Sequence, residues 1–211
     1  MQALRVSRLY QPITSLGFGR RAGIWFQGCS IGCPGCGSKH TWGVEGGEEV
    51  TVAQVLSWLS SSSTSLAGVT ISGGEPFEQP RALLKLLQQI RVRFKERDDF
   101  DVLIYSGYPF RQLMSRHSAM LNQVDALVSG PYLRNRDSAW LRGSVNQEIH
   151  TFSRLGEARY GSSASLGQSN SLQVIVDGAA VRIVGIPERG DLAKLEQELK
   201  NRGVKLGSSS Y

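Results

Sequence analysis

All three cysteines of this 211-residue chain lie in one stretch, Gln27 to Trp42, which reads QGCSIGCPGCGSKHTW. Cys29, Cys33 and Cys36 follow a C-x3-C-x2-C spacing, with glycine at positions 28, 32, 35 and 37. Glycine adopts the positive φ angles that a tight wrap around an inorganic centre needs, and it lets backbone N–H groups come close to sulfur. The stretch therefore predicts a loop that encloses a metal centre.

Zinc and a disulfide are the alternatives to an iron–sulfur centre. Structural zinc takes four ligands, usually as two pairs, and no second C-x2-C or H-x3-H pair exists here, so only His40 could be the fourth. A disulfide leaves one thiol over and needs an oxidising compartment. A [4Fe-4S] cluster held by three thiolates keeps one iron open for a substrate or cofactor. The cysteines favour this cluster over zinc or a purely structural role.

The cysteine spacing resembles the cluster motif of radical S-adenosylmethionine (SAM) enzymes. Its particular form, GC-x3-CPGC followed by Thr41-Trp42, resembles the anaerobic ribonucleotide reductase activating proteins. Gly35 stands where the wider superfamily often has an aromatic residue, but it matches this group. The resemblance implies that the open iron chelates the amino and carboxylate groups of SAM. An electron from the cluster then splits the C–S bond to give methionine and a 5′-deoxyadenosyl radical.

Composition suits a single compact α/β domain, since 40% of the residues are hydrophobic and 24 are glycine. No apolar run of about 18 residues appears, and the N-terminus lacks the apolar core of a signal peptide, so we expect a cytoplasmic protein with no membrane span. The net charge is +6, but its basic residues are scattered and form no block interleaved with aromatic residues. This distribution argues against nucleic-acid binding.

Short apolar runs alternate with helical patterns along the first two thirds of the chain. This alternation predicts a parallel sheet, in which the first strand delivers the cysteine loop at its carboxyl end. Thr51 is a predicted N-cap and Pro80 a predicted first helical residue. The expected strands are residues 23–26, 69–72, 102–105 and 124–128, and the expected helices are residues 52–59, 80–94 and 110–116.

The second informative motif is Ser72-Gly73-Gly74-Glu75-Pro76, which follows the second predicted strand. Two glycines allow a sharp bend and would leave backbone amides free to donate to a ligand. A tight strand-to-helix turn is the structural alternative. The resemblance implies that Gly73, Gly74, Glu75 and Pro76 help to hold SAM, with Glu75 opposing the positive charge near the sulfonium.

Further matches to the family lie downstream. Tyr105-Ser106-Gly107-Tyr108 resembles the end of its third strand, and residues 140–147, WLRGSVNQ, resemble its W-R-G-S-x-N-Q segment with Leu141 inserted. Ser106 and Asn146 are accordingly candidate cofactor-binding residues. The alternative for the second stretch is a polar turn that stabilises the end of the sheet. Ser129 replaces an aspartate that the family usually has, so no carboxylate role transfers to it.

Residues 153–211 extend beyond the part that matches, which covers about residues 15–152. They predict a β-hairpin, Leu172–Val176 and Val181–Ile186 with a tight turn at Asp177-Gly178, then a helix from Asp191 closed by Gly203. We expect this extension to shape the partner-facing side and help choose the substrate. The alternative is that the hairpin adds strands to the sheet and the helix covers the core.

Together these features predict one domain over residues 1–211, a partial parallel (βα) barrel of the radical SAM type with a C-terminal hairpin and helix. Cys29, Cys33 and Cys36 would hold the cluster, and no catalytic side chain is assigned beyond it. The resemblance implies hydrogen abstraction from a backbone glycine of an anaerobic ribonucleoside-triphosphate reductase, with reduced flavodoxin or ferredoxin as electron donor. One alternative is the same chemistry on another glycyl-radical enzyme, a peptide or a small molecule. The other is a non-catalytic iron–sulfur or zinc module that binds a partner.

Overall fold

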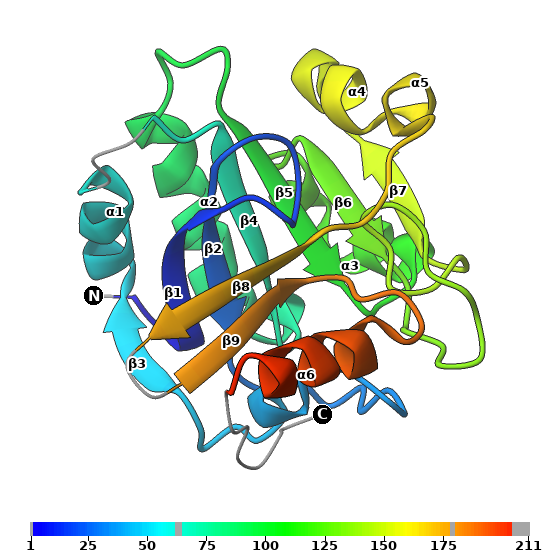
Figure 1. Ribbon diagram of the computed structural model, residues 1–211. Coiled ribbons are helices and arrows are strands. Elements are labelled where there is room, and N and C mark those ends of the chain that lie inside the picture. Colours follow the sequence, from blue (N-terminus) through cyan, green and yellow to red (C-terminus); the bar gives the residue numbers. More distant parts are fainter. Residues whose placement is uncertain (1, 62–64, 178–179, 204–211) are drawn as a thin grey trace.

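The structure, a computed structural model, describes residues 2–61, 65–177 and 180–203. Its main sheet has the strand order β3-β1-β2-β4-β5-β6-β7 (Figure 1). The strands are β1 (Ala3–Ile13), β2 (Arg21–Phe26), β3 (Glu48–Thr51), β4 (Gly68–Gly73), β5 (Asp101–Ser106), β6 (Ala126–Ser129) and β7 (Glu148–Thr151). The helices that follow these strands are α1 (Val52–Ser60), α2 (Pro80–Arg93), α3 (Phe110–Leu121), α4 (Arg154–Tyr160) and α5 (Ser162–Ser165).

The centre of the sheet is parallel, because β2, β4, β5 and β6 pair in the same direction. This confirms the predicted α/β class and the four predicted strands. The last of them begins at Ala126 instead of Val124, since the Val124 N–H donates to the Leu121 carbonyl in the turn after α3. Parallel strands end at the same edge of a sheet, so the loops after β2, β4 and β5 are neighbours.

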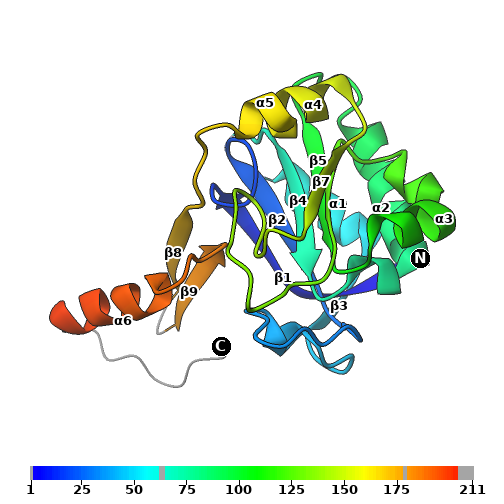
Figure 2. The ribbon, with the colours of Figure 1, turned by 90° about the vertical axis from the view of Figure 1, so that its right-hand side faces the viewer.

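Helices α1, α2 and α3 cover one face of the sheet (Figure 2). Apolar side chains at alternate positions of the parallel strands meet the apolar stripes of these helices and form the main core. Thr51 caps α1 as predicted, in a capping box with Gln54, and Pro80 opens α2 as predicted. The third helix runs to Leu121, past the expected end at Arg116.

Three strands were not expected, and all three are antiparallel to a neighbour. β1 pairs antiparallel with β2 and with β3, and β7 pairs antiparallel with β6. They extend the parallel centre at both edges, so the sheet is mixed. All three mix charged or polar residues with apolar ones, so no continuous apolar run reveals them in the sequence.

The other face of the sheet is covered by the C-terminal hairpin of β8 (Leu172–Asp177) and β9 (Ala180–Gly185), as Figure 2 shows. The hairpin forms a two-stranded sheet of its own, so the alternative in which it adds strands to the main sheet is wrong. Ile175 and Val184 are buried against Ile13 and Leu16, next to Tyr10, Trp25 and Tyr105. Gly178, in the predicted tight turn, lies outside the described residues.

Helix α6 (Asp191–Asn201) follows the hairpin and projects from the body (Figure 2). The predicted Gly203 closes the turn after its last residue: the Gly203 N–H donates to the Lys200 carbonyl, and its φ is +77°. None of its side chains is fully buried, so the alternative in which this helix covers the core is wrong. None of the helices in the described residues is long and apolar enough to cross a membrane.

A buried ionic cluster closes the amino-terminal end of the parallel strands, opposite the cysteines. Arg21 at the start of β2 pairs with Asp101 at the start of β5, and both are completely buried. Arg159 and Tyr160 of α4 also donate to the Asp101 carboxylate. Thr70 accepts from the Arg21 Nε at 2.7 Å. Every charge in the cluster therefore has a partner, which a buried ion pair requires.

Candidate functional site: the cysteine loop and its neighbours

The cysteine loop leaves the carboxyl end of β2 and is anchored by backbone hydrogen bonds. The Gly28 N–H donates to the Thr41 carbonyl at 2.7 Å, and the Cys29 N–H donates to the Trp42 carbonyl at 3.1 Å. Within the loop, the Cys36 N–H donates to the Cys33 carbonyl at 3.0 Å. All three thiols are free and half-buried. These hydrogen bonds give the loop a defined shape.

Positive φ angles occur in the loop where glycine was expected to allow them. Gly28, Gly32 and Gly35 have φ of +97°, +60° and +78°. A Cβ at Gly35 would lie 2.8 Å from the Arg134 Cδ, so glycine also lets a side chain from the loop after β6 lie against the cysteines. This close approach is a physical reason for glycine before the third cysteine.

The sulfur atoms face backbone donors. The Ser38 N–H donates to the Cys36 sulfur at 3.3 Å. Burial raises the pKa of the Cys29 thiol, an effect that the N–H groups of Ile31 and Gly32 oppose. Burial likewise raises the pKa of the Cys33 thiol, opposed by the backbone of Tyr132. A coordinating metal removes the thiol proton, and N–H donors then stabilise the thiolate charge.

The donor set fits a cluster better than a single ion. In the described residues, no three His, Cys, Asp or Glu side chains are grouped so that they could hold one metal ion. His40, the candidate zinc ligand, is instead near Arg8 and Arg182, and its pKa is lowered by burial and by those two cations. A cluster binds each thiolate through a different iron, so three separate thiols with N–H donors nearby suit it.

The Gly73-Gly74 turn joins the end of β4 to the cysteine loop. The Gly74 N–H donates to the Phe26 carbonyl and the Glu75 N–H donates to the Gly28 carbonyl, both at 2.8 Å. The expectation that this turn leaves its amides free is therefore wrong for Gly74 and Glu75. A Cβ at Gly74 would lie 2.1 Å from the Gly28 oxygen, and Gly73 has φ of +103°. Glycine is needed here because two backbones touch.

Glu75 is buried, with 1% of its surface exposed. Its Oε1 accepts from the Phe77 N–H at 3.1 Å and from the Ser106 hydroxyl at 2.9 Å, and its Oε2 accepts from the Gly107 N–H at 2.8 Å. Burial raises the pKa of this carboxyl to about 7, although these three donors oppose the shift. The carboxyl therefore ties the loop after β4 to the loop after β5, and it brings the candidate Ser106 into the site. Pro76, the next residue, is buried as well.

Two residues just after Glu75 also touch the cysteine loop, and sequence reasoning did not single them out. The Glu78 carboxylate accepts from Ser30 and from the Tyr108 hydroxyl. The Gln79 amide donates to the Gln27 carbonyl at 2.9 Å. Both follow a motif whose signal ends at Pro76, and a polar residue at the start of a helix is ordinarily read as solvated. No pattern in the chain marked them.

The 140–147 stretch folds as a polar turn. Asn146 donates to the Pro131 carbonyl, Gln147 donates to the Gly130 carbonyl, and Ser144 accepts from the Leu133 N–H. These bonds favour the structural alternative for the stretch. No hydrogen bond in the described residues joins the Asn146 side chain to the cysteine loop. The turn acts on the site indirectly, because the segment 130–134 that it holds includes Tyr132 and Arg134, which lie against Cys33 and Gly35.

Ser129, which replaces the family's usual aspartate, faces away from the cysteines. Its hydroxyl lies 3.0 Å from the His150 Nε2, and the His150 ring stacks on Phe110 of α3 at 3.7 Å. This side of β6 faces the helices, so Ser129 belongs to the packing of β6 and β7 on α3.

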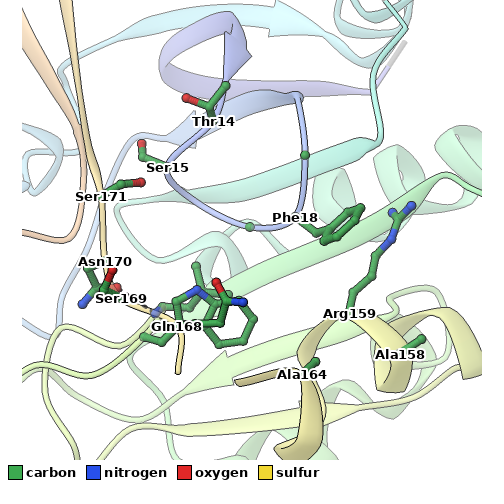
Figure 3. Close-up of a pocket in the computed structure, with 14 residues that line it drawn as sticks. Thr14, Ser15, Phe18, Ala158, Arg159, Ala164, Gln168, Ser169, Asn170 and Ser171 are labelled. Carbon is green, nitrogen blue, oxygen red and sulfur yellow. Dashed lines mark hydrogen bonds between the residues drawn. The ribbon is translucent and has the colours of Figure 1, made fainter. Parts of the chain in front are cut away.

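A cavity of about 290 Å³ lies at the opposite end of the strands (Figure 3). Phe18 and Arg159 face each other on one side of it, with the guanidinium 4.6 Å from the ring centre. The residues that line it are Thr14, Ser15, Gly17, Phe18, Gly19, Trp140, Leu141, Ala158, Arg159, Ala164, Gln168, Ser169, Asn170 and Ser171. None of the predicted site residues is among them.

The chain is similar to one protein-family model and to several known proteins. Residues 15–150 match the family model described as "4Fe-4S single cluster domain". The chain is 31% identical over 150 residues to an anaerobic ribonucleoside-triphosphate reductase-activating protein of Escherichia coli K12, covering 67% of this chain and 95% of that protein. It is 30% identical over 143 residues to the protein of the same name from Haemophilus influenzae, covering 64% and 90%.

Two other similarities are more limited. A pyruvate formate-lyase-activating enzyme of Clostridium pasteurianum is 38% identical over 76 residues, covering 34% of this chain and 32% of that enzyme. Among solved structures, QueE from Escherichia coli matches with a TM-score of 0.40 and 21% identity, covering 50% of this chain and 53% of that chain.

Proposed function

Because this chain belongs to the family of anaerobic ribonucleoside-triphosphate reductase-activating proteins, we propose that it is a radical SAM activating enzyme for such a reductase. In the proposed reaction one electron cleaves SAM to methionine and a 5′-deoxyadenosyl radical. The radical takes a hydrogen atom from a backbone glycine of the partner, which yields 5′-deoxyadenosine and a glycyl radical. The reducing cytoplasm is the proposed location, with reduced flavodoxin or ferredoxin as the donor.

One observation carries this proposal: the three-thiol loop and the GGEP segment are joined directly, through the Glu75 N–H bond to the Gly28 carbonyl. Cys29, Cys33 and Cys36 would hold a [4Fe-4S] cluster, which supplies the electron and an open iron for SAM. Gly73, Gly74, Glu75 and Pro76 would form the wall beside it that receives SAM.

The buried Glu75 carboxyl and Ser106 would orient that wall by fixing the loop after β4 to the loop after β5. Asn146 would contribute through the segment at Pro131 that its amide holds. The mixed sheet, with helices on one face and the hairpin on the other, would serve as a partial barrel of the radical SAM type. In this proposal residues 1–211 form one domain, with a core at about 15–152 and an extension at about 153–211.

A second candidate partner is another glycyl-radical enzyme. The similarity over 76 residues to a pyruvate formate-lyase-activating enzyme favours the same reaction on a different protein. The two candidates differ only in which glycine is oxidised, so the partner must be varied in the experiment.

The test begins with anaerobic reconstitution, which should load about four iron and four sulfide per chain. Each of Cys29→Ala, Cys33→Ala and Cys36→Ala should lose the intact cluster, because the chain has no spare thiol. A variant that keeps the full iron content would show that its cysteine is not a ligand.

The loaded protein should then convert SAM to methionine and 5′-deoxyadenosine when dithionite is added. Electron paramagnetic resonance should detect a glycyl radical after incubation with an anaerobic ribonucleoside-triphosphate reductase, and none with pyruvate formate-lyase. A radical on the second partner alone would favour the second candidate. Failure to cleave SAM would contradict both.

A further inference from the structure

Glu78 stands where the loops after three neighbouring strands meet. It ends the short 3-10 helix η2 (Pro76–Glu78), which follows β4. Its Oε1 accepts from the Ser30 hydroxyl at 2.6 Å, from the Ser30 N–H at 3.0 Å and from the Tyr108 hydroxyl at 3.1 Å. Its Oε2 lies 3.2 Å from the same Ser30 N–H. One carboxylate thus joins the cysteine loop after β2 to the loop after β5.

The position of Ser30 makes this contact relevant to the cysteines. Ser30 directly follows Cys29 and precedes the turn that leads through Ile31 and Gly32 to Cys33. The backbone bonds to Thr41 and Trp42 fix the loop at Gly28 and Cys29, but not beyond. Glu78 holds the next residue, and charge-assisted hydrogen bonds of this kind are about twice as strong as neutral ones. The carboxylate therefore sets the direction in which the loop leaves Cys29.

Glu78 also brings negative charge close to the first cysteine. Its carboxylate accepts hydrogen bonds from the N–H and the hydroxyl of Ser30, the residue next to Cys29. A carboxylate held this close to a centre bound at Cys29 disfavours an added electron on that centre. Net charge around an iron–sulfur cluster is one of the factors that set its reduction potential.

We propose that Glu78 is a positioning residue for the cluster: it fixes the loop at Ser30 and holds the reduction potential of the cluster low. This rests on the proposed function, in which a low potential is needed to donate an electron to SAM. The two effects have different origins, because the first needs the reach of the side chain and the second needs its charge. Conservative substitutions can separate them.

The first measurement is amide hydrogen exchange on the metal-free protein. Glu78→Asp keeps the charge but shortens the side chain, so exchange of the Ser30 amide should accelerate about tenfold, as expected for loss of a charged hydrogen bond. Glu78→Gln keeps an oxygen acceptor at the same reach and should accelerate exchange less than Glu78→Asp does. Glu96→Gln, at an exposed glutamate after α2, is the matched control and should leave exchange at Ser30 unchanged.

The second measurement is a redox titration of the reconstituted cluster. Glu78→Gln should shift the midpoint potential to more positive values, whereas Glu78→Asp and Glu96→Gln should stay near the wild-type value. Tyr108→Phe removes one hydrogen bond and no charge, so it should also leave the potential unchanged. A role in packing alone would not produce this split between the aspartate and glutamine variants.

The proposal is overturned if both Glu78 variants match Glu96→Gln in exchange and in potential. It is also overturned if the aspartate and glutamine variants shift the potential equally. Failure of the proposed function has its own sign: the wild-type protein would load no cluster or would not cleave SAM. The exchange measurement on metal-free protein still decides whether Glu78 fixes the loop.

Discussion

Glu75 is a single residue whose ionised form is disfavoured by burial in the site. Its carboxyl is buried and its pKa is raised from 4.5 to about 7. Between these two values the folded protein keeps a proton that the unfolded chain has released. Folding stability from this group is therefore fully present below about pH 4.5 and is lost as the pH rises through about 7.

We expect this pH dependence to disappear in Glu75→Gln, which has no proton to lose at this position. The measurement is the free energy of unfolding of metal-free protein at about pH 5 and about pH 8. Wild type should lose more stability across this interval than the variant, while the three histidines titrate in both and cancel. An equal change in the free energy of unfolding for wild type and variant would show that the pKa of Glu75 is not raised in the folded protein.

At this site the sequence predicted the role of a residue only where the residue type alone indicates the chemistry. Three thiols in one short stretch indicate a metal centre wherever they fold, so the loop could be identified in advance. Glu78 could not be found this way, because its importance comes from contacts with Ser30 and Tyr108 that only the fold creates. For the same reason the sequence wrongly predicted free N–H groups at Gly74 and Glu75, whose acceptors lie at the end of β2 and in the cysteine loop.

At the scale of elements, the junction between the cysteine loop and the turn after β4 depends on two backbones in contact. Gly74→Ala should lower the free energy of unfolding by about 3 kcal/mol, because its Cβ would overlap the Gly28 oxygen. Gly37 lies in the cysteine loop with nothing within 4 Å of a Cβ, so Gly37→Ala should be close to neutral. Urea unfolding of metal-free proteins measures both. Equal stability of the two variants would mean that the loop can move away from the turn.

The hairpin offers a second test at this scale. Ile175→Ala removes a side chain that is 7% exposed and should cost about 2 to 3 kcal/mol. Val176→Ala, on the opposite face of the same strand, removes one that is 73% exposed and should change little. A thermal-unfolding comparison distinguishes them. If Ile175→Ala were as stable as Val176→Ala, the hairpin would not be packed on the sheet.

The parallel strands were predictable from their apolar residues, whereas the antiparallel strands on either side of them were not. β2, β4 and β5 contain short apolar segments and are buried at most positions on both faces, which is typical of parallel strands. β1 mixes Arg5, Arg8 and Pro12 among its apolar residues, and β7 has only four residues. Strands of this kind, outside the parallel centre, are stabilised by pairing with their neighbours more than by their own composition.

At the scale of the whole molecule, the extension has two parts with different expected roles. The hairpin is packed on the sheet, whereas α6 contributes no buried side chain. A chain truncated after Gly190 should stay folded, load its cluster and cleave SAM without a productive partner reaction. Truncation near Gly161 should also expose Ile13 and Leu16 and reduce solubility.

Activation of the partner by the Gly190 truncation at the wild-type rate would contradict a role of α6 in choosing the substrate. The measurement is the glycyl-radical signal per partner chain, with SAM cleavage as the control. Loss of the cluster in the Gly190 truncation would show instead that the last part of the chain supports the site.

The buried pair of Arg21 and Asp101 has a consequence for how sequences of this family can diverge. Losing Asp101 leaves Arg21 as an uncompensated buried charge, which typically costs about 3 to 5 kcal/mol. Losing Arg21 costs less, because Asp101 keeps Arg159 and Tyr160 as partners. Across many relatives, an arginine aligned with position 21 should therefore rarely occur without an acidic residue aligned with position 101.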